Sequence, residues 1–174
     1  YYLPEESSTG EAADMDLAIV SGHGPDILCD LDHLKPLVME QDIVVFGYRD
    51  SVQSVQYGCQ DIKNTTMINA IELVDVQRLG FQNAASLGIE TLLKDELSGF
   101  WIHLDADVLN DSIMPAVDYR LPGGITFSEL SNLLKLLLLS KKAVGISVAI
   151  LNPTLDKDGS ITRNFMSCIA EGLS

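Results

Sequence analysis

The chain has 174 residues, 47% of them hydrophobic and 21% charged, which is typical of a globular protein rather than a disordered one. Its net charge of −14, from 25 acidic and 11 basic residues, argues against nucleic acid or an anionic lipid surface as a partner. A well-solvated surface explains this acidity without any ligand, although such a surface also tolerates cationic substrates and metal ions.

The first half of the chain predicts a loop, a helix and two strands. Residues 1–10 are rich in turn-forming side chains, and residues 11–20 predict a helix. The β-branched apolar run at 42–47 predicts a buried parallel strand. A polar segment follows at 49–61, and 67–73 predicts a weaker strand.

The second half alternates helices and strands. Helical spacing extends over residues 74–96, with Gly80 and Gly88 as weak points. The later elements are a strand at 100–104, a helix at 127–139, a buried strand at 143–151 and a helix at 161–173. This alternation predicts βαβ units and a mainly parallel sheet.

In such sheets, ligands bind beyond the carboxyl ends of the strands. Asp105, Asp107, the segment after Gly47 and the Asn152-Pro153 turn are all predicted to lie at that edge. The sequence therefore predicts that a functional site forms there.

Two aspartates form the strongest candidate site. Asp105 and Asp107 follow a buried strand, where side chains two apart point to the same side. Two like charges at the mouth of a core are costly unless a cation pairs them, and their hard oxygen atoms suit Mg²⁺ or Mn²⁺. By the same spacing, His103 is a candidate hydrogen-bond partner of a metal ligand. The alternatives are aspartates that cap backbone amides and a histidine satisfied within the core.

An Asp-x-Asp motif after an apolar strand is not specific by itself. Phosphatases of the haloacid dehalogenase type use its first aspartate as a nucleophile. Glycosyltransferases use the motif to hold a metal ion and a sugar nucleotide. The segments that follow the motif must therefore discriminate among these classes.

Those segments are 114–118 (MPAVD), 121–126 (LPGGIT) and 152–156 (NPTLD). With the Asp-x-Asp motif and in this order, they resemble the ureohydrolase family of arginases, agmatinases and formimidoylglutamases. The early segments 4–10 (PEESSTG) and 46–50 (FGYRD) resemble further motifs of that family. The resemblance extends over essentially the whole chain.

The resemblance implies an α/β protein with a three-layer αβα fold of the arginase/deacetylase kind, here a single partial domain over residues 1–174. It implies hydrolysis of a C–N bond in a linear amidine or guanidino compound, with two Mn²⁺ ions activating water. Asp105 and Asp107 would then be metal ligands. Family members are usually homo-oligomers. Because the three cysteines form no CxxC pair or dense framework, we expect a cytoplasmic protein. Because the sequence has no apolar run of about 18 residues, we expect no membrane partner.

The sequence also departs from the family pattern. The family's other metal ligands would precede Tyr1, and we therefore expect that an amino-terminal part of the protein is missing here. Ala13 stands where the family has a catalytic histidine, and Ile150 stands where arginases have a glutamate that grips a guanidinium. These departures favour a divergent member with a different substrate.

The candidate substrate-binding residues are Asp50, Thr126 and Glu11. Thr126 with Glu129 also has the pattern of a helix capping box, and this role alone explains both residues. Asp50 is equally well explained as a local partner of Arg49.

Two alternative functions stay open. A glycosyltransferase would use Asp105 and Asp107 to hold a metal–nucleotide, but it needs an upstream nucleotide-binding strand that is not evident. A catalytically inactive arginase-like binding module is the other alternative, and Ala13 and Ile150 support it.

Overall fold

The computed structural model describes residues 1–7 and 9–174, which divide into two units. Unit 1 comprises Tyr1–Val45 and Asp50–Ala70, and unit 2 comprises Phe46–Arg49 and Ile71–Ser174. The prediction of one domain over the whole chain stays a prediction, so each unit is described by itself. Among the described residues, no helix combines the length and the apolar character that crossing a membrane requires.

Unit 1 consists mainly of short helices. They are α1 (Ala12–Val20), α2 (Asp26–Cys29), η1 (Leu31–His33), η2 (Glu40–Asp42), α3 (Ser51–Gln56) and α4 (Ile62–Thr65), where η denotes a 3₁₀ helix. The helix predicted at 11–20 is confirmed. Helix α3 lies in the segment that was expected only to be polar, because a six-residue helix with exposed Val52 and Val55 has no apolar stripe to reveal it.

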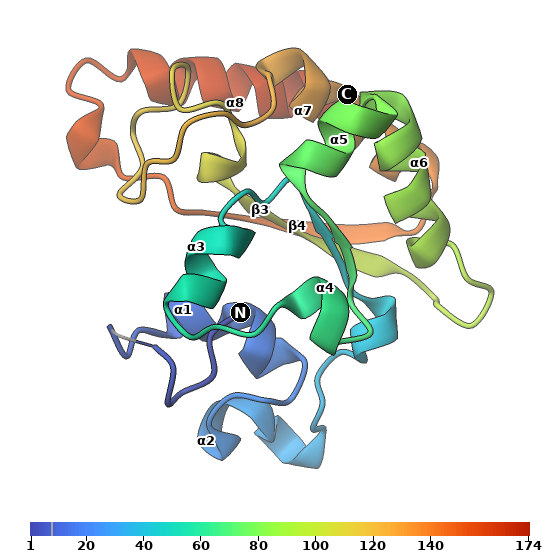
Figure 1. Cartoon of the computed structure of the whole chain (residues 1–174). Coiled ribbons are helices and arrows are strands. Elements are labelled where there is room, and N and C mark those ends of the chain that lie inside the picture. Colours follow the sequence, from blue (N-terminus) through green and yellow to red (C-terminus); the bar gives the residue numbers. More distant parts are fainter. Residues whose placement is uncertain (8) are drawn as a thin grey trace. The chain divides into compact units, whose positions relative to one another are not determined.

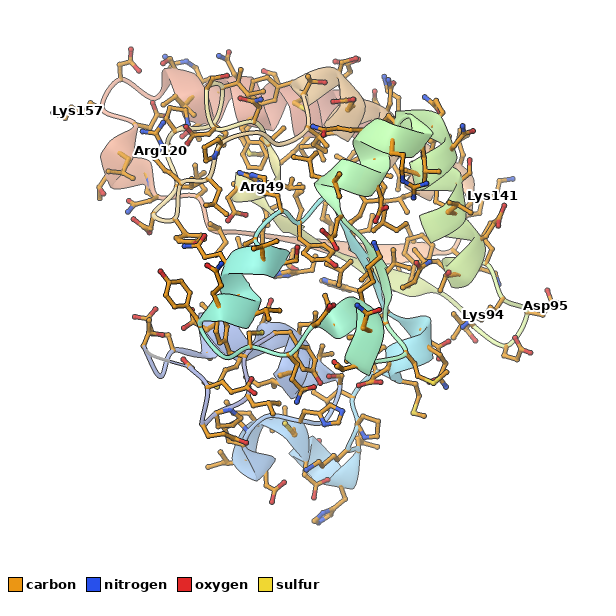
Figure 2. All side chains as sticks on the ribbon, in the orientation of Figure 1. Arg49, Lys94, Asp95, Arg120, Lys141 and Lys157 are labelled. Carbon is orange, nitrogen blue, oxygen red and sulfur yellow. The ribbon has the colours of Figure 1, made fainter. Side chains whose placement is uncertain are left out.

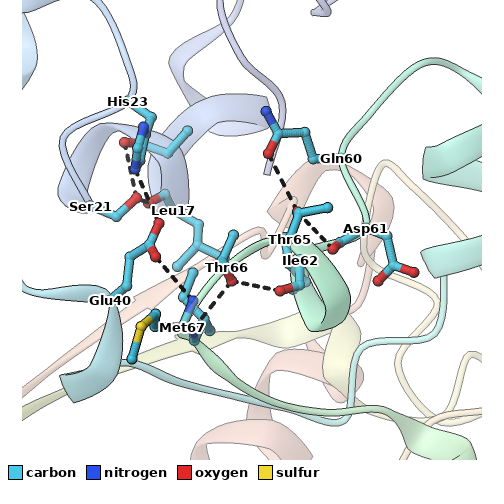
Figure 3. Close-up of polar contacts among 12 residues, drawn as sticks. Leu17, Ser21, His23, Glu40, Gln60, Asp61, Ile62, Thr65, Thr66 and Met67 are labelled. Atoms are coloured by element: carbon cyan, nitrogen blue, oxygen red, sulfur yellow. Dashed lines mark hydrogen bonds and ion pairs between the residues drawn. The ribbon is translucent and has the colours of Figure 1, made fainter.

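Polar contacts join the segments of unit 1 (Figure 3). The carboxylate of Glu40 lies 3.1 Å from Nε2 of His23 through one oxygen and accepts the backbone N–H of Met67 at 3.0 Å through the other. Near this contact, the hydroxyl of Thr66 donates to the backbone carbonyl of Ile62 at 2.5 Å. The two contacts of Glu40 connect parts of unit 1 that are distant in the sequence, whereas the Thr66 bond is local to the end of α4.

Strands β1 (Val44–Phe46) and β2 (Asn69–Ile71) form a two-stranded sheet and confirm the strands predicted at 42–47 and 67–73. The backbone N–H of Asn69 donates to Ile43 at 3.0 Å, and that of Gly47 donates to Ile71 at 2.8 Å. β1 is only half-buried, so the expectation of a fully buried strand is wrong there.

Unit 2 contains the longer elements. They are α5 (Leu73–Leu79), α6 (Phe81–Leu92), β3 (Phe100–Asp105), η3 (Ala106–Val108), α7 (Phe127–Leu139), β4 (Ala143–Ala149), η4 (Pro153–Leu155) and α8 (Ser160–Gly172). The helix predicted at 127–139 is confirmed at both ends. The helix predicted at 74–96 is divided in two by Gly80, whose φ of +80° does not continue a helix.

β3 and β4 are parallel, as predicted, with His103 opposite Ser147 and Asp105 opposite Ala149. Helices α7 and α8 lie side by side over one face of this pair (Figure 1). Leu104 of β3 shares a buried core with Leu134 of α7 and Phe165 of α8. One face of the strand pair therefore carries the core of unit 2.

The two strands are less buried than their apolar composition predicted. Trp101 is 61% exposed and Val144 is 68% exposed. Among the described residues β3 and β4 form a sheet of two strands, and the core lies against one face only. Apolar residues on the opposite face or at the edges consequently remain accessible.

Candidate metal centre

Asp105 and Asp107 occupy different kinds of backbone. Asp105 is the last residue of β3, at the carboxyl end where the site was predicted, whereas Asp107 lies in the 3₁₀ helix η3. The two-residue alternation of a strand therefore applies to His103 and Asp105 but does not extend to Asp107, contrary to the argument from spacing. Both aspartates are half-buried, so their carboxylates lie at the margin between core and solvent.

Arg49, labelled in Figure 2, fixes the turn that carries Asp107. Its guanidinium donates to the backbone carbonyl of Asp107 at 2.8 Å, to that of Leu121 at 2.9 Å and to that of Pro122 at 3.2 Å. One planar side chain thus connects the turn of the candidate metal ligands to the loop before α7. The sequence offered Arg49 only as a partner for Asp50. Sequence reasoning missed the role of Arg49 in holding this turn. The signal that could have revealed it is that Arg49 comes just after a predicted strand, at the edge where the site was predicted.

The Gly-Gly turn lies against the segment that follows Asp107. The N–H of Asn110 donates to Ile125 at 2.8 Å, and the N–H of Ile125 donates to Val108 at 3.0 Å. A Cβ on Gly124 would lie 2.4 Å from the carbonyl carbon and oxygen of Leu109, and Gly124 has a φ of +118°. Gly124 is therefore required for close backbone contact and not only for making a turn.

Thr126 caps helix α7. Its hydroxyl accepts the N–H of Glu129 at 3.2 Å, and the carboxylate of Glu129 accepts the N–H of Thr126 at 2.8 Å. This confirms the predicted capping box. The threonine is exposed, and its role in substrate binding stays a prediction.

His103 contacts the first of the two aspartates. Its Nε2 atom lies 3.2 Å from Oδ1 of Asp105, and its Nδ1 atom lies 2.8 Å from the hydroxyl of Ser147 on β4. The side chain is 49% exposed, so the alternative of a core histidine is wrong. The structure thus brings His103 and Asp105 together as the spacing predicted.

Asn152 connects the end of β4 to the segment 114–118. Its backbone N–H donates to Ala116 at 2.9 Å, and its side-chain amide donates to Asp118 at 2.7 Å. Its side-chain oxygen accepts the N–H of Thr154. β4 ends at Ala149, so the strand stops three residues before the Asn-Pro motif that was expected to end it, and the motif holds the neighbouring loop.

Asp156 anchors the start of α8. Its carboxylate accepts the hydroxyl of Thr162 at 2.6 Å and the backbone N–H groups of Thr162 and Ile161 at 2.7 and 3.2 Å. The hydrogen bond from the Thr162 hydroxyl is the largest cause of a lowered pKa for this carboxyl group, and the two backbone N–H groups lower it further.

Arg120 and Asp111 form a bidentate ion pair at 2.6 and 2.8 Å within the loop between η3 and α7. The hydrogen bond from Arg120 lowers the pKa of Asp111, and the same bond raises the pKa of Arg120. The structure gives Arg120 a partner nine residues earlier.

Glu11 and Asp50 belong to unit 1. Glu11 is exposed and precedes α1, and Asp50 precedes α3 and accepts the hydroxyl of Ser54 at 3.0 Å. Their roles as substrate contacts stay predictions. Ile150, at the position where arginases have glutamate, follows the end of β4 with a φ of +66°.

The residues at the end of β3 fit part of a divalent metal site. Asp105 and Asp107 supply hard carboxylate oxygens, the donors that Mg²⁺ and Mn²⁺ favour, and the contacts of His103 and Arg49 restrict this segment. Two carboxylates do not complete a binuclear centre, so this chain's unit 2 would contribute a share of the ligands.

The Arginase family model matches residues 27–173. An arginase of Staphylococcus aureus (strain MRSA252) is 28% identical over 169 residues, covering 96% of this chain and 53% of the relative. An arginase of Bacillus caldovelox is 26% identical, covering 97% and 53%. The chain spans about half the length of these curated relatives.

Two solved structures show the fold. A crystal structure of an arginase from Bacillus subtilis has a TM-score of 0.86 at 22% identity, covering 99% of this chain and 59% of that one. The formimidoylglutamase from the same organism has a TM-score of 0.65 at 20% identity, covering 78% and 41%. Together with the parallel β3–β4 pair, these likenesses confirm the arginase-like α/β fold.

Proposed function

This chain belongs to the arginase family, and on that premise we propose that the whole protein hydrolyses the C–N bond of a linear amidine or guanidino compound at a pair of Mn²⁺ ions. The proposal includes a small-molecule substrate, a cytoplasmic location and a homo-oligomer, with neither nucleic acid nor a membrane as a partner. Asp105 and Asp107 are the metal ligands that this chain contributes.

The position of Asp105 and Asp107 is the observation that supports the proposal most. Asp105 is the last residue of β3 and Asp107 lies in the short turn that follows, next to the core of unit 2. A bound pair of divalent ions supplies Lewis-acid chemistry, making water nucleophilic at neutral pH and stabilising charge that develops on the substrate. The two carboxylates bring the charge and the hard oxygen atoms that hold such ions.

The other residues of the site orient these ligands. Arg49 holds the backbone of Asp107, and His103 contacts the carboxylate of Asp105. The net charge of −14 favours the approach of a cationic amidine or guanidinium group. Asp50, Thr126 and Glu11 are the proposed contacts for the rest of the substrate.

Ile150 argues for a substrate other than arginine. It is an apolar residue just beyond β4, where the family resemblance leads to a guanidinium-binding glutamate. An aliphatic side chain offers no carboxylate for the planar guanidinium, which is best recognised by a bidentate acceptor. We therefore propose that the substrate is an amidine whose recognition does not need a carboxylate at this position.

Family membership excludes the glycosyltransferase alternative. An inactive binding module is the second candidate, and the apolar residues Ala13 and Ile150 favour it. The two candidates differ in whether a metal-loaded protein turns over any amidine.

Elemental analysis after Mn²⁺ loading of the whole protein, with assays of urea release from arginine and agmatine and of formamide release from formiminoglutamate, tests the proposal. The wild-type protein should hold about two Mn²⁺ per subunit and hydrolyse one of these compounds. Asp105→Asn and Asp107→Asn should lose both properties. The control is Asp95→Asn, an exposed carboxylate in the loop before β3 (Figure 2). Metal retention in both site variants would overturn the ligand assignment, and stoichiometric metal without turnover would favour the binding module.

A further inference from the structure

Four side chains of β3 and β4 form a continuous series of polar contacts that ends at Asp105. The indole N–H of Trp101 donates to the hydroxyl oxygen of Ser147 at 3.1 Å. The same hydroxyl lies 2.8 Å from Nδ1 of His103, whose Nε2 lies 3.2 Å from Oδ1 of Asp105. The parallel register explains the series, because it places Ser147 opposite His103, and Trp101 and Asp105 lie two residues to either side of that histidine.

When the imidazole of His103 is neutral, the chemistry of the four groups decides which atom donates and which accepts in each contact of the series. An indole N–H only donates and a carboxylate only accepts, so the two ends of the series are fixed. The proton of His103 then lies on Nε2, facing Asp105, and Nδ1 accepts. Ser147 satisfies both neighbours by accepting from the indole and donating its own proton to Nδ1.

A glycine makes room for the first member. Gly145 lies opposite Trp101, and a Cβ at Gly145 would lie 2.1 Å from the Cζ3 atom of the indole ring. The ring therefore rests directly on the backbone of β4, from where its N–H reaches Ser147. The absence of a side chain at residue 145 is needed for this placement.

Packing alone does not orient these side chains. Trp101 and His103 are both exposed, so hydrogen bonds rather than core neighbours define the ring positions. A long exposed side chain ordinarily samples several rotamers. The hydrogen bonds from Trp101 through Ser147 to His103 restrict that freedom for a ring whose Nε2 lies 3.2 Å from Oδ1 of a candidate metal ligand.

We propose that Trp101 and Ser147 are positioning residues, which hold His103 in the Nε2–H tautomer and through it fix the carboxylate of Asp105 for metal binding. The last link of this inference rests on the proposed function. The tautomer and the orientation of His103 do not depend on any metal.

The first test is the tautomer of His103 in the metal-free protein. Nitrogen-15 NMR at pH 8, above the ordinary histidine pKa of about 6.5, separates a protonated ring nitrogen from an unprotonated one. His103→Gln identifies its signals among the three histidines. We expect Nε2–H in the wild type, a shift toward a tautomer mixture in Ser147→Ala, and recovery in Ser147→Thr, which keeps the hydroxyl. An Nδ1–H tautomer in the wild type, or no change in Ser147→Ala, would overturn the inference.

The second test is the affinity for Mn²⁺, measured by isothermal titration of the whole protein with the same substitutions. Ser147→Ala should weaken binding about ten- to one-hundredfold, and Ser147→Thr should stay close to wild type. Trp101→Phe removes the indole N–H but keeps an aromatic ring, and Gly145→Ala displaces the ring without changing any donor. Both should weaken binding less than Ser147→Ala does.

The two tests separate the inference from the proposed function. Equal Mn²⁺ affinity in wild type and Ser147→Ala would overturn the positioning role. A wild type with the expected tautomer that binds no Mn²⁺ would contradict the metal site and the last link together, while the series from Trp101 to His103 would stand.

Discussion

Unit 1 and unit 2 are stabilised in different ways. Unit 2 contains a contiguous core that joins β3 to α7 and α8, with Phe165 and Leu134 almost completely buried. Unit 1 buries apolar residues such as Met15 and Ile68 outside that core cluster and leaves Ile27 and Leu34 largely exposed. It connects its segments through polar contacts such as those of Glu40 (Figure 3). The candidate metal ligands therefore lie on the unit whose contiguous apolar core resists local opening.

The attachment of the site to that core is also specific. Ala106, between the two aspartates, is fully buried, as is Leu109 just after them. Arg49 and the Gly123-Gly124 turn then hold the outer side of the same segment. A carboxylate pair on such a segment is preorganised, which is what a binding site for a metal ion requires.

The largest expected effect is the loss of the aromatic ring at the centre of unit 2. Phe165→Ala leaves a cavity between α8 and its neighbours and should lower the free energy of unfolding by about 3–5 kcal/mol. Trp101 is the one tryptophan of the chain and lies on β3, so its fluorescence in urea reports on unit 2. Met166→Ala, at an exposed position of the same helix, is the control and should change stability by about 0.5 kcal/mol or less.

Cysteine labelling sharpens this experiment. The three free thiols are buried, with Cys168 in unit 2 and Cys29 and Cys59 in unit 1. In Phe165→Ala, we expect Cys168 to react faster while Cys29 and Cys59 keep their wild-type rates. Equal acceleration at all three would mean that the two units open together, which would remove the contrast between them.

The second effect concerns the glycine that lies against the segment just after the candidate metal ligands. Gly124→Ala forces a Cβ against the backbone of Leu109 at a positive φ, and strain with overpacking should cost about 3 kcal/mol. Gly58 in unit 1 has a φ of +94° but no atom within 4 Å of an added Cβ, so Gly58→Ala should cost only about 1–2 kcal/mol. Urea unfolding of both variants measures the two losses of stability. Equal losses would show that the positive φ alone, and not the contact with Leu109, determines the cost of adding a Cβ.

These two glycines also show what sequence can and cannot predict here. The Gly-Gly motif indicated a turn, but the need for glycine at 124 arises from the backbone of Leu109, fifteen residues earlier. Similarly, Arg49 binds carbonyls more than 70 residues away, and no local pattern encodes that partner. Contacts between distant segments were therefore missed.

Local signals were predictive where they were strong and continuous. Residues 127–139 combine an apolar stripe with a capping box, and the predicted helix matches α7 at both ends. Asp105 was correctly placed at the end of a strand because an apolar run stops there. By contrast, α3 is too short to have a periodic pattern, and Gly80 divides a segment whose spacing predicted one helix.

The third effect is the loss of the α7 cap. Thr126→Ala removes the hydroxyl that accepts the N–H of Glu129 and should lower stability by about 1 kcal/mol, while Thr126→Ser should retain most of it. Thermal unfolding followed by circular dichroism measures the difference. If both variants keep wild-type stability but raise the KM for an amidine, the residue acts on substrate and the capping explanation is insufficient.

The smallest expected effect is a change in how stability depends on pH, and it concerns Asp156 at the start of α8. Its pKa is lowered in the folded protein, chiefly by the hydrogen bond from Thr162, so its ionised form favours folding. This stabilisation is complete above the ordinary aspartate pKa of about 3.9 and is lost as the pH falls toward the lower folded value. Asp156→Asn should therefore be less stable than wild type at neutral pH, and the gap should narrow on acidification below about pH 4.

Urea midpoints measured by Trp101 fluorescence between neutral and acid pH test this sign. The other carboxylates with lowered pKa values, such as Asp111 and Asp158, titrate in both proteins and cancel in the difference. Asp95→Asn, in an exposed loop of the same unit, should follow the wild-type curve. A gap that stays constant with pH would show that Asp156 stabilises α8 through hydrogen bonds that its protonated form makes equally well, so that its charge has no share in anchoring unit 2.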